Sequence, residues 1–449
     1  MVKSMEKSVQ EDPVLNSDAT MKIVGKTIFK YIAVFFVTVL LLTGALYFAA
    51  KIPKNTIRKH MLESAEYLYG EELFGSVISF ADSSMIDKYA DSILLNIAWN
   101  YDSKYTMRSI MLSGFYFFPN YEENENLLVS VRDGNGPTQQ YLRYWHGSIA
   151  IVRPLLTIMS IKGIYVLNAT VLVLLFAALI VTLLKMKEAA PALGLTLGVV
   201  MTSWWFVPLS LEYTWCCVTA LAAALVAIVL VKKEKSSFYG PFFMITGMVT
   251  IFLDFLTTEL LTLLIPLLII LWLDRKKDTT VKTAARAVIT WGIGYSCMWI
   301  MKWILTGIVF GENPLPYVTG HIEERLGGDM GISLPVYLYR AVSRNTGTMF
   351  PFDYGIPGMT AGIILLAAAV CYGIFFRRDD FDKKLVFVLA VLGMLPFVRF
   401  LVLHNHSLRH SFFVHRVLAA TVLAVILILS EITGSGTGRR NRWKNLKFR

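Results

Sequence analysis

The sequence predicts an all-α integral membrane protein with about ten membrane-spanning helices, a large first outer loop and interfacial helices. Of the 449 residues, 55% are hydrophobic and only 17% are charged, a balance that no ordinary soluble domain needs. The apolar residues form uncharged blocks long enough to cross a bilayer as helices. The basic residues form short clusters between those blocks, as they do in the cytoplasmic loops of membrane proteins.

The charge and the cysteines exclude other classes of protein. The formal net charge of +11 does not indicate a nucleic-acid-binding protein, because the basic residues are divided among the loops between apolar blocks. The four cysteines all fall inside apolar blocks, so we predict no disulfide framework. The sequence also lacks a nucleotide-binding motif and a stretch that would form a soluble domain.

The chain begins with a polar and mildly basic segment, residues 1–30, which we expect to be a loosely ordered cytoplasmic tail. Residues 31–50 form an uninterrupted apolar run, long enough for a first span. A signal peptide is the alternative interpretation of this run. The apolar core of a signal peptide is usually shorter than this run, however, and the polar tail that precedes the run is long. We therefore predict a membrane anchor.

Residues 51–143 form the first sizeable hydrophilic segment, and within it residues 81–100 predict a helix. Ser84 and Asp87 have the spacing of a capping box, and apolar residues then recur with helical spacing. Asp87 and Asp91 stand four apart on one flank, where paired carboxylates suit acid/base chemistry. The simpler interpretation is that Asp87 caps the helix and Asp91 is solvated. The second half of the segment predicts loop and turns.

We expect residues 144–159 to form an amphipathic helix in the membrane interface, because 164–184 suffices for the second span. Further apolar runs predict eight more spans, which makes nine between residues 164 and 433: 189–207, 214–231, 238–253, 260–273, 287–310, 359–376, 385–403 and 417–429. Together these segments form a polytopic membrane domain that covers residues 31–433.

The distribution of positive charge predicts the orientation of this domain. Placing the amino terminus inside collects lysines and arginines in the inner loops and in a basic cytoplasmic tail at 434–449. The short outer loops at 208–213 and 254–259 then carry none. Both termini are therefore predicted to be cytoplasmic, and the large loops 51–143 and 311–358 face outward.

Ionisable side chains within or beside the spans are informative, because a charge is costly in hydrocarbon. Lys302 falls in the outward half of its predicted span, and Arg416 begins the last one. Between the last two spans, residues 404–415 hold four of the seven histidines. The interfacial helix adds His146 and Arg153 at the same depth. Each cation alone could extend to lipid phosphates, but the set predicts a cationic site at the outer interface.

Two further features of the outer side leave alternatives open. His406 and His410 have the spacing of metal ligands on one helix face, so a divalent cation is an open interpretation, and hydrogen bonding to a neighbour is the simpler one. No HExxH motif is present, and we predict neither a metal site nor another cofactor. Asp254 and Glu259, in a short outer loop, either satisfy helix ends or belong to the site.

An outer face with carboxylates on a loop helix and cations at phosphate depth suits an anionic lipid. Guanidinium groups match phosphate geometry, and a carboxylate base can activate an acceptor hydroxyl. A polyprenyl-phosphate-linked sugar needs both. We therefore expect catalytic roles for Asp87 and Asp91. Roles in binding the lipid phosphate or the substrate are expected for Arg153, Lys302, His406, His410, Arg416, His146 and Asp254.

Four short segments resemble those of a family of uncharacterised bacterial multi-pass membrane proteins: 144–147 (YWHG), 153–156 (RPLL), 254–257 (DFLT) and 405–416, with Asn405, His406, Ser407, His410, Phe412, Phe413 and Arg416. The layout resembles the GT-C superfamily of polyprenyl-phosphate-dependent glycosyltransferases. That resemblance implies a catalytic acid in the first outer loop, at Asp87 or Asp91. The loop has no DxD or ExD pair, and Trp204-Trp205 lies within a span instead of in a WWD motif.

The resulting hypothesis is a multi-pass glycosyltransferase of the bacterial plasma membrane, which moves a sugar from a polyprenyl-phosphate carrier to a cell-envelope acceptor. Its partners would be the lipid-linked donor and membrane lipid, with no nucleic acid. The alternatives are a flippase or transporter of lipid-linked precursors and a non-catalytic envelope assembly protein. Coupled transporters place ionisable groups near the midplane, where Lys302 alone is a candidate.

Overall fold

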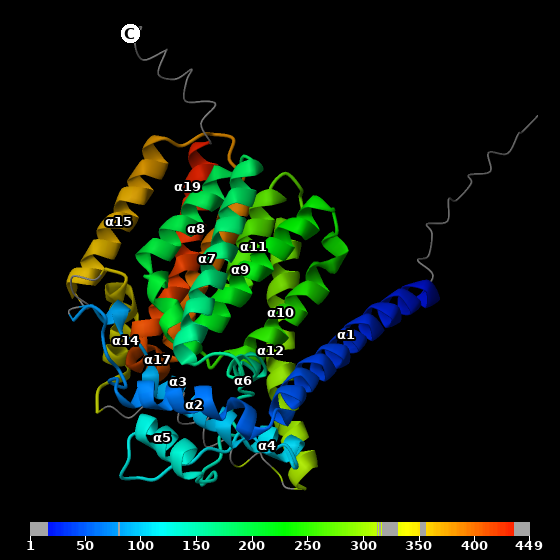
Figure 1. Ribbon diagram of the computed structural model, residues 1–449. Coiled ribbons are helices and arrows are strands. Elements are labelled where there is room, and N and C mark those ends of the chain that lie inside the picture. Colours follow the sequence, from blue (N-terminus) through cyan, green and yellow to red (C-terminus); the bar gives the residue numbers. More distant parts are fainter. Residues whose placement is uncertain are drawn as a thin grey trace, which may run out of the picture.

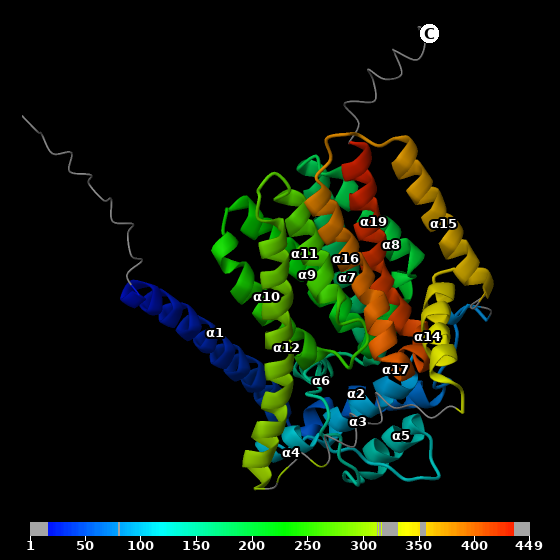
Figure 2. The same ribbon diagram turned by 180° about the vertical axis from the view of Figure 1, so that it is seen from behind.

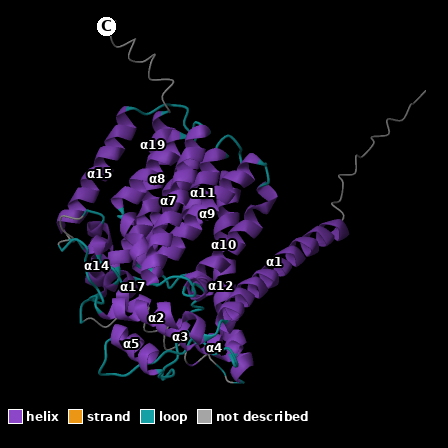
Figure 3. Ribbon diagram, in the orientation of Figure 1, coloured by secondary structure: helices purple, strands orange, loops and turns teal. Residues whose placement is uncertain are grey.

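The computed structural model describes residues 17–79, 81–311, 313, 316, 331–350 and 356–434. Every regular element in these residues is a helix, and none is a strand (Figure 3). Seven helical segments are long and apolar enough to cross a membrane, and three further apolar helices are shorter. These elements confirm the predicted all-α integral membrane class, and each predicted span coincides with an apolar helix.

The apolar helices form an upright bundle (Figures 1 and 2). Its members are α7 (Ile161–Lys185), α8 (Ala189–Met201), α9 (Leu211–Lys232), α10 (Tyr239–Leu253), α11 (Leu261–Leu273), α12 (Thr280–Phe310), α15 (Ile356–Phe375), α16 (Lys383–Val402) and α19 (Leu418–Thr433). The pairs α10–α12, α9–α11, α8–α19 and α16–α19 pack most extensively. The first helix, α1 (Ser17–Lys51), stands at an angle to the bundle (Figure 1) and packs mainly against α6, α10 and α4.

Two glycines explain the close approach of α10 and α12. A Cβ atom added to Gly247 would lie 2.3 Å from the carbonyl oxygen of Trp291, and one on Gly294 would lie 2.2 Å from that of Met244. Small residues of this kind let membrane helices bring their backbones together. By contrast, α1 keeps large apolar side chains outward, since Phe29, Leu40 and Phe48 are all more than 70% exposed. A bilayer would cover that face.

Four helices form what we call the cap layer, which lies across one end of the bundle (Figure 1). They are α2 (Lys54–Tyr69), α3 (Lys88–Asn100), α4 (Thr106–Leu112) and α5 (Glu123–Asp133). Three short elements lie where this layer meets the bundle: α6 (Ile149–Leu155), α17 (His404–Arg409) and α18 (Ser411–Val414). The cap layer corresponds to the large first loop of the sequence, and the carboxyl end of α19 lies at the opposite end of the bundle (Figures 1 and 2).

Several expected boundaries differ from those in the structure. The second half of the first loop is not all loop and turns, because it contains α4 and α5. In α5 the apolar positions Leu127 and Val131 are buried, and Asn124 donates to the carbonyl oxygen of Leu68 at 3.1 Å. Tertiary packing thus forms a helix from a strongly polar segment. The expected interfacial helix at 144–159 is reduced to α6, and its Arg153 is fully buried.

The ends of other segments differ as well. The predicted tail at 1–30 is helical from Ser17, and residues 1–16 lie outside the described part. The run 189–207 is broken, because α8 ends at Met201 and a 3-10 turn, Trp204–Leu209, follows it. The loop 311–358 includes a helix, α14 (Leu334–Thr348). Of the basic tail at 434–449, only Gly434 is described.

Candidate functional site

Asp87 begins α3 as its N-cap, with the carboxylate accepting from the backbone N–H of Ala90 at 2.7 Å. The capping box predicted from Ser84 is therefore wrong. The hydroxyl of Ser84 donates instead to the carbonyl oxygen of Ala81 at 2.7 Å, within a 3-10 turn that precedes the helix. Asp87 is 4% exposed, so its carboxylate is at the contact between the cap layer and the bundle instead of in solvent.

The carboxyl of Asp87 contacts that of Glu212, which stands in the first turn of α9. Burial raises the pKa of Asp87 to about 7, against the opposing effect of the Ala90 N–H, and the nearby Asp91 raises it further. The Oε2 atom of Glu212 is buried without a hydrogen-bond partner within the described residues. Two buried carboxyl groups in contact cannot both ionise readily, so each opposes the ionisation of the other.

Asp91 has different surroundings. Of the simpler interpretation, the capping by Asp87 is confirmed, but the solvation of Asp91 is wrong because Asp91 is fully buried. One carboxylate oxygen accepts from the N–H of Leu211 at 2.8 Å and from the hydroxyl of Ser210 at 3.1 Å. The other accepts from the hydroxyl of Tyr165. Asp91 thus joins α3 to α7 and to the start of α9. Burial raises its pKa, and Lys88 opposes that rise.

Lys88 supplies the positive charge that acts on Asp91. Its Nζ donates to the carbonyl oxygen of Leu209 at 3.2 Å and to the hydroxyl of Tyr165 at 3.3 Å. Burial lowers the pKa of this lysine, while Asp91 raises it. A lysine and a carboxylate that are both buried and hydrogen-bonded hold the two layers together, because separating them would leave an uncompensated charge.

Arg416 approaches the start of α3 from the other end of the sequence. Its Nη2 donates to the carbonyl oxygen of Ser83 at 3.0 Å, and its guanidinium carbon lies 4.7 Å from the centre of the Tyr213 ring. The side chain is 1% exposed, yet Nε and Nη1 have no hydrogen-bond partner within the described residues. The Phe412 and Phe74 rings, 6.1 Å apart, add to the same contact. The segment before α19 therefore meets the 3-10 turn, Asp82–Ser84, that leads into α3.

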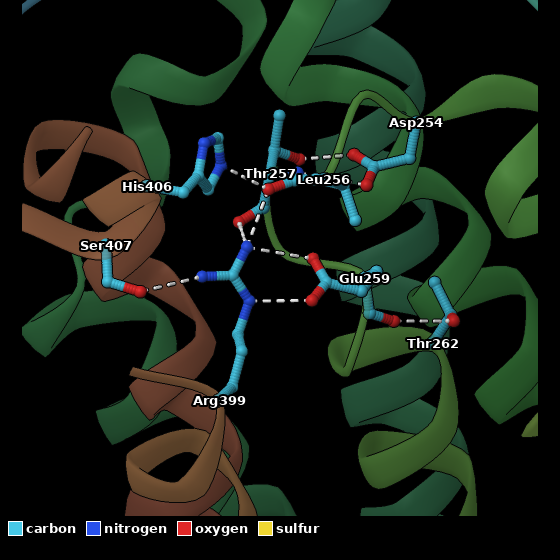
Figure 4. Close-up of polar contacts among 8 residues, drawn as sticks. All are labelled: Asp254, Leu256, Thr257, Glu259, Thr262, Arg399, His406 and Ser407. Carbon is cyan, nitrogen blue, oxygen red and sulfur yellow. Dashed lines mark hydrogen bonds and ion pairs between the residues drawn. The ribbon is translucent and has the colours of Figure 1, made fainter. Parts of the chain in front are cut away.

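A second polar cluster lies on the α10–α11 loop and surrounds Arg399 (Figure 4). Its Nε and Nη2 donate to the two carboxylate oxygens of Glu259, at 2.6 and 3.1 Å. Nη2 also donates to the carbonyl oxygen of Leu256 at 2.6 Å, and Nη1 lies 3.4 Å from the hydroxyl of Ser407. Every nitrogen of this guanidinium is thus occupied. The bidentate pair fastens the loop to α16 and α17.

His406 and Asp254 belong to this same cluster (Figure 4). The Nε2 of His406 lies 2.8 Å from the carbonyl oxygen of Leu256, whose backbone has a left-handed φ of 67°. Two side chains therefore hold one carbonyl of a residue in an unfavourable conformation. Asp254 accepts from the N–H of Thr257 at 3.0 Å and from its hydroxyl. Burial raises the pKa of Asp254 to about 7, and Glu259 contributes to the rise.

His406 in α17 and His410, the residue that ends this helix, adjoin each other. The ring centres of His406 and His410 are 4.7 Å apart, and His410 stacks on Phe413 at 5.3 Å. Among the described residues, however, no group of three His, Cys, Asp or Glu side chains could hold a metal ion. The contacts of these two histidines include a carbonyl oxygen for His406 and aromatic rings for both.

Three residues expected at the site lie elsewhere. Arg153 donates to the carbonyl oxygen of Ala98 and, at 2.7 Å, to that of Ile52, so it binds the far end of α3. Lys302 donates to the carbonyl oxygen of Ile110 at 2.8 Å and fastens α4 to α12. Each satisfies carbonyl groups at a helix end and makes no contact with the Asp87 group.

His146 is the third residue that was expected at the site and lies elsewhere. Its buried ring lies 4.9 Å from the ring of Tyr141 and 5.2 Å from that of Phe255. Burial lowers its pKa well below the ordinary histidine value, and Lys302 and Arg143 lower it further.

Sequence reasoning missed Glu212, Tyr213 and Tyr165. Glu212 and Tyr213 are in the first turn of α9, although the sequence places them in the short outer loop 208–213, which contains no lysine or arginine. An acidic residue at the first turn of an apolar span is the signal that could have been used, since carboxylates beside the hydrocarbon are costly.

The site is therefore the group formed by Asp87, Glu212, Tyr213, Arg416 and, through its positioning contacts, Asp91. Comparisons of the chain with models of protein families, with curated proteins and with solved structures give no match.

Proposed function

We propose that this protein is a membrane-embedded glycosyltransferase that moves a sugar from a polyprenyl-phosphate carrier to a hydroxyl-bearing acceptor of the bacterial cell envelope. The supporting observation is that the Asp87–Glu212 acid pair and Arg416 both adjoin Tyr213, while two nitrogens of Arg416 have no hydrogen-bond partner within the described residues. A base poised near neutral pH and a guanidinium with free donors are the groups that such a transfer needs.

The proposed step divides the work between these groups. Asp87 takes the proton from the acceptor hydroxyl, whose oxygen forms a bond to the anomeric carbon of the sugar. The bond between that carbon and the phosphate oxygen breaks, and the polyprenyl phosphate leaves with the electron pair. Arg416 binds the leaving phosphate through Nε and Nη1, which have no hydrogen-bond partner within the described residues. Asp91 is a positioning residue, since its hydrogen bonds hold α3 against α9.

The location also supports a lipid-linked substrate. The site stands between the cap layer and one end of a bundle of apolar helices, which is the depth at which lipid headgroups lie. The cap layer faces outward in this proposal, with both termini cytoplasmic, as the basic loops indicate. His406, His410 and Asp254 support the site indirectly, by holding the α10–α11 loop and the segment that leads to Arg416.

The Asp87→Asn variant tests the catalytic step. We expect transfer to fall on the order of a hundredfold or more, because the amide cannot accept the proton. Purified protein in vesicles is supplied with a polyprenyl-phosphate-linked sugar and solubilised envelope acceptor, and transfer is measured. Asp133→Asn, an exposed carboxylate of α5, is the matched control. Equal activity in both variants would contradict the proposal, and lipid translocation without transfer would replace it with a flippase.

Arg416 tests the phosphate end. Arg416→Ala should weaken binding of a polyprenyl-phosphate analogue by about tenfold or more, whereas Arg416→Lys should restore only part of it because lysine lacks the bidentate fork. Binding is measured on detergent-purified protein. Arg409→Ala, an exposed arginine of the same segment, should bind normally. Wild-type affinity in Arg416→Ala would show that the guanidinium only ties the chain to Ser83.

A further inference from the structure

A cavity of about 600 Å³ lies at the other end of α3 from the Asp87 site. Its walls are the junction of α1 and α2, the turn between α3 and α4, and α4 itself. Because α3 has 13 residues at 1.5 Å each, the two locations are about 20 Å apart. The polar lining includes Lys54, Asn55, Asn100, Lys104, Arg108 and Ser109. None of these residues takes part in the proposed transfer.

The charge of the cavity is predominantly positive. Its lining has three cations, Lys54, Lys104 and Arg108, and one carboxylate, Asp102. Asp102 is already engaged, since it accepts from the backbone N–H groups of Lys104 at 2.7 Å and Tyr105 at 3.4 Å. Within the described residues none of the three cations forms an ion pair. A positive cavity of this kind favours an anionic ligand.

Aromatic rings orient two of these cations. The Nζ of Lys54 lies 5.3 Å from the centre of the Trp99 ring, and the guanidinium of Arg108 lies 4.8 Å from that of Phe310. Burial and the nearby Arg153 lower the pKa of Lys54, so a bound anion would stabilise its charged form. Asp102 opposes this lowering at Lys54, but neither Lys54 nor Arg108 forms an ion pair within the described residues.

The depth of the cavity indicates where its ligand comes from. Two membrane helices end here, α1 at Lys51 and α12 at Phe310, and Lys51 donates to the carbonyl oxygen of Ser103 at 2.9 Å. Tyr105 is 68% exposed beside them, and exposed tyrosines are frequent at the membrane surface. The cavity is therefore at the level of lipid headgroups.

We propose that this cavity binds a phosphate ester with a hydroxyl-bearing substituent, the chemistry shared by an anionic phospholipid headgroup and soluble glycerol phosphate. Lys54, Lys104 and Arg108 bind the phosphate oxygens, and Asn55 and Ser109 bind the hydroxyls. The volume is in the ordinary range for a small-molecule site. This site is independent of the proposed glycosyl transfer, because it shares no residue with it.

The test uses the full-length protein and two probes. Lipid retention is measured by native mass spectrometry from nanodiscs of phosphatidylcholine mixed with phosphatidylglycerol, and glycerol phosphate binding is measured by calorimetry in detergent. We expect phosphatidylglycerol to be retained over phosphatidylcholine. The double variant Lys54→Gln/Arg108→Gln should lose about tenfold or more in affinity, because charge-assisted hydrogen bonds are removed. Melting temperatures verify that it folds.

The matched control is Arg58→Gln/Lys59→Gln, which removes the same charge from exposed positions of α2 outside the cavity. It should bind as the wild type does. Binding of both probes supports a lipid headgroup, and binding of glycerol phosphate alone supports a soluble ligand of the same chemistry. An equal loss of affinity in the control variant would show that binding depends only on general surface charge, and it would overturn the proposal. Wild-type affinity for both probes in the cavity variant would do the same.

Discussion

Asp87 and Asp91 are four residues apart on α3 and have different surroundings. Asp91 is held by the N–H of Leu211 and two hydroxyls, whereas Asp87 accepts one backbone N–H and contacts Glu212. A carboxylate with three donors is committed to structure, and one beside a second carboxyl group can exchange a proton. The helical spacing predicted that the two stand on one flank. The spacing could not predict their partners on other elements, because these partners belong to α7 and to the start of α9, which are distant in sequence.

The raised pKa of Asp87 gives a pH prediction with opposite signs for rate and stability. Transfer should rise tenfold per pH unit at low pH and level off near pH 7, because the base must be ionised and its pKa is about 7. The fold favours the protonated form, so Asp87's contribution to stability falls as pH rises from about 4 through about 7.

The measurements are a pH–rate profile in vesicles and melting temperatures in detergent over the same range. Asp87→Asn should flatten the melting temperature's dependence on pH in this window. A rate that is constant across this window would exclude Asp87 as the base.

At the scale of the elements, apolar composition predicted the helices of the bundle, because residues that face lipid and residues that face other helices are both hydrophobic. It did not predict α4, α5 or α14. These helices are short or strongly polar, and contacts distant in sequence stabilise them, such as that of Asn345 with the carbonyl oxygen of Ser407 at 2.7 Å. Such contacts give no local pattern.

The α10–α12 contact provides an element-scale prediction with an internal control. Gly294→Ala should destabilise the protein by about 1–3 kcal/mol, because its Cβ would lie 2.2 Å from the carbonyl oxygen of Met244 and overpack the contact. Gly292→Ala, on the same helix, has no atom within 4 Å of the added Cβ. It should be neutral or stabilise by up to about 1 kcal/mol through helix propensity. The melting temperatures of the two variants are compared in detergent. Equal melting temperatures would contradict the close packing of α10 and α12.

At the scale of the whole molecule, the sequence predicted which groups would stand near the membrane surface but not which of them would meet. Arg416 reaches the carbonyl oxygen of Ser83 across 333 positions of sequence. Arg153 and Lys302, expected beside it, are instead bound to carbonyl groups of α3 and α4. Depth follows from hydropathy, whereas position around the bundle depends on how helices pack.

The orientation is tested by labelling single cysteines in a cysteine-free background. Gln140→Cys and Ser333→Cys should react with an impermeant thiol reagent applied to intact cells, and Ser236→Cys should react only after lysis. All three positions are exposed, whereas the loop residues Asn124 and Asn345 are buried and unsuitable. Labelling of Ser236→Cys in intact cells would reverse the proposed topology.

The pairing of Arg399 with Glu259 also affects how the chain is made. The partners are 140 residues apart, so at about 5–20 residues per second the ribosome delivers the arginine roughly 7–28 s after the glutamate. During that interval the α10–α11 loop carries Asp254 and Glu259 without their cation, and it must stay hydrated at the membrane surface. When α16 is inserted, Arg399 pairs with Glu259, and the α10–α11 loop can then be buried between the helices. Completion of this end of the bundle therefore waits for one of the last helices to leave the ribosome.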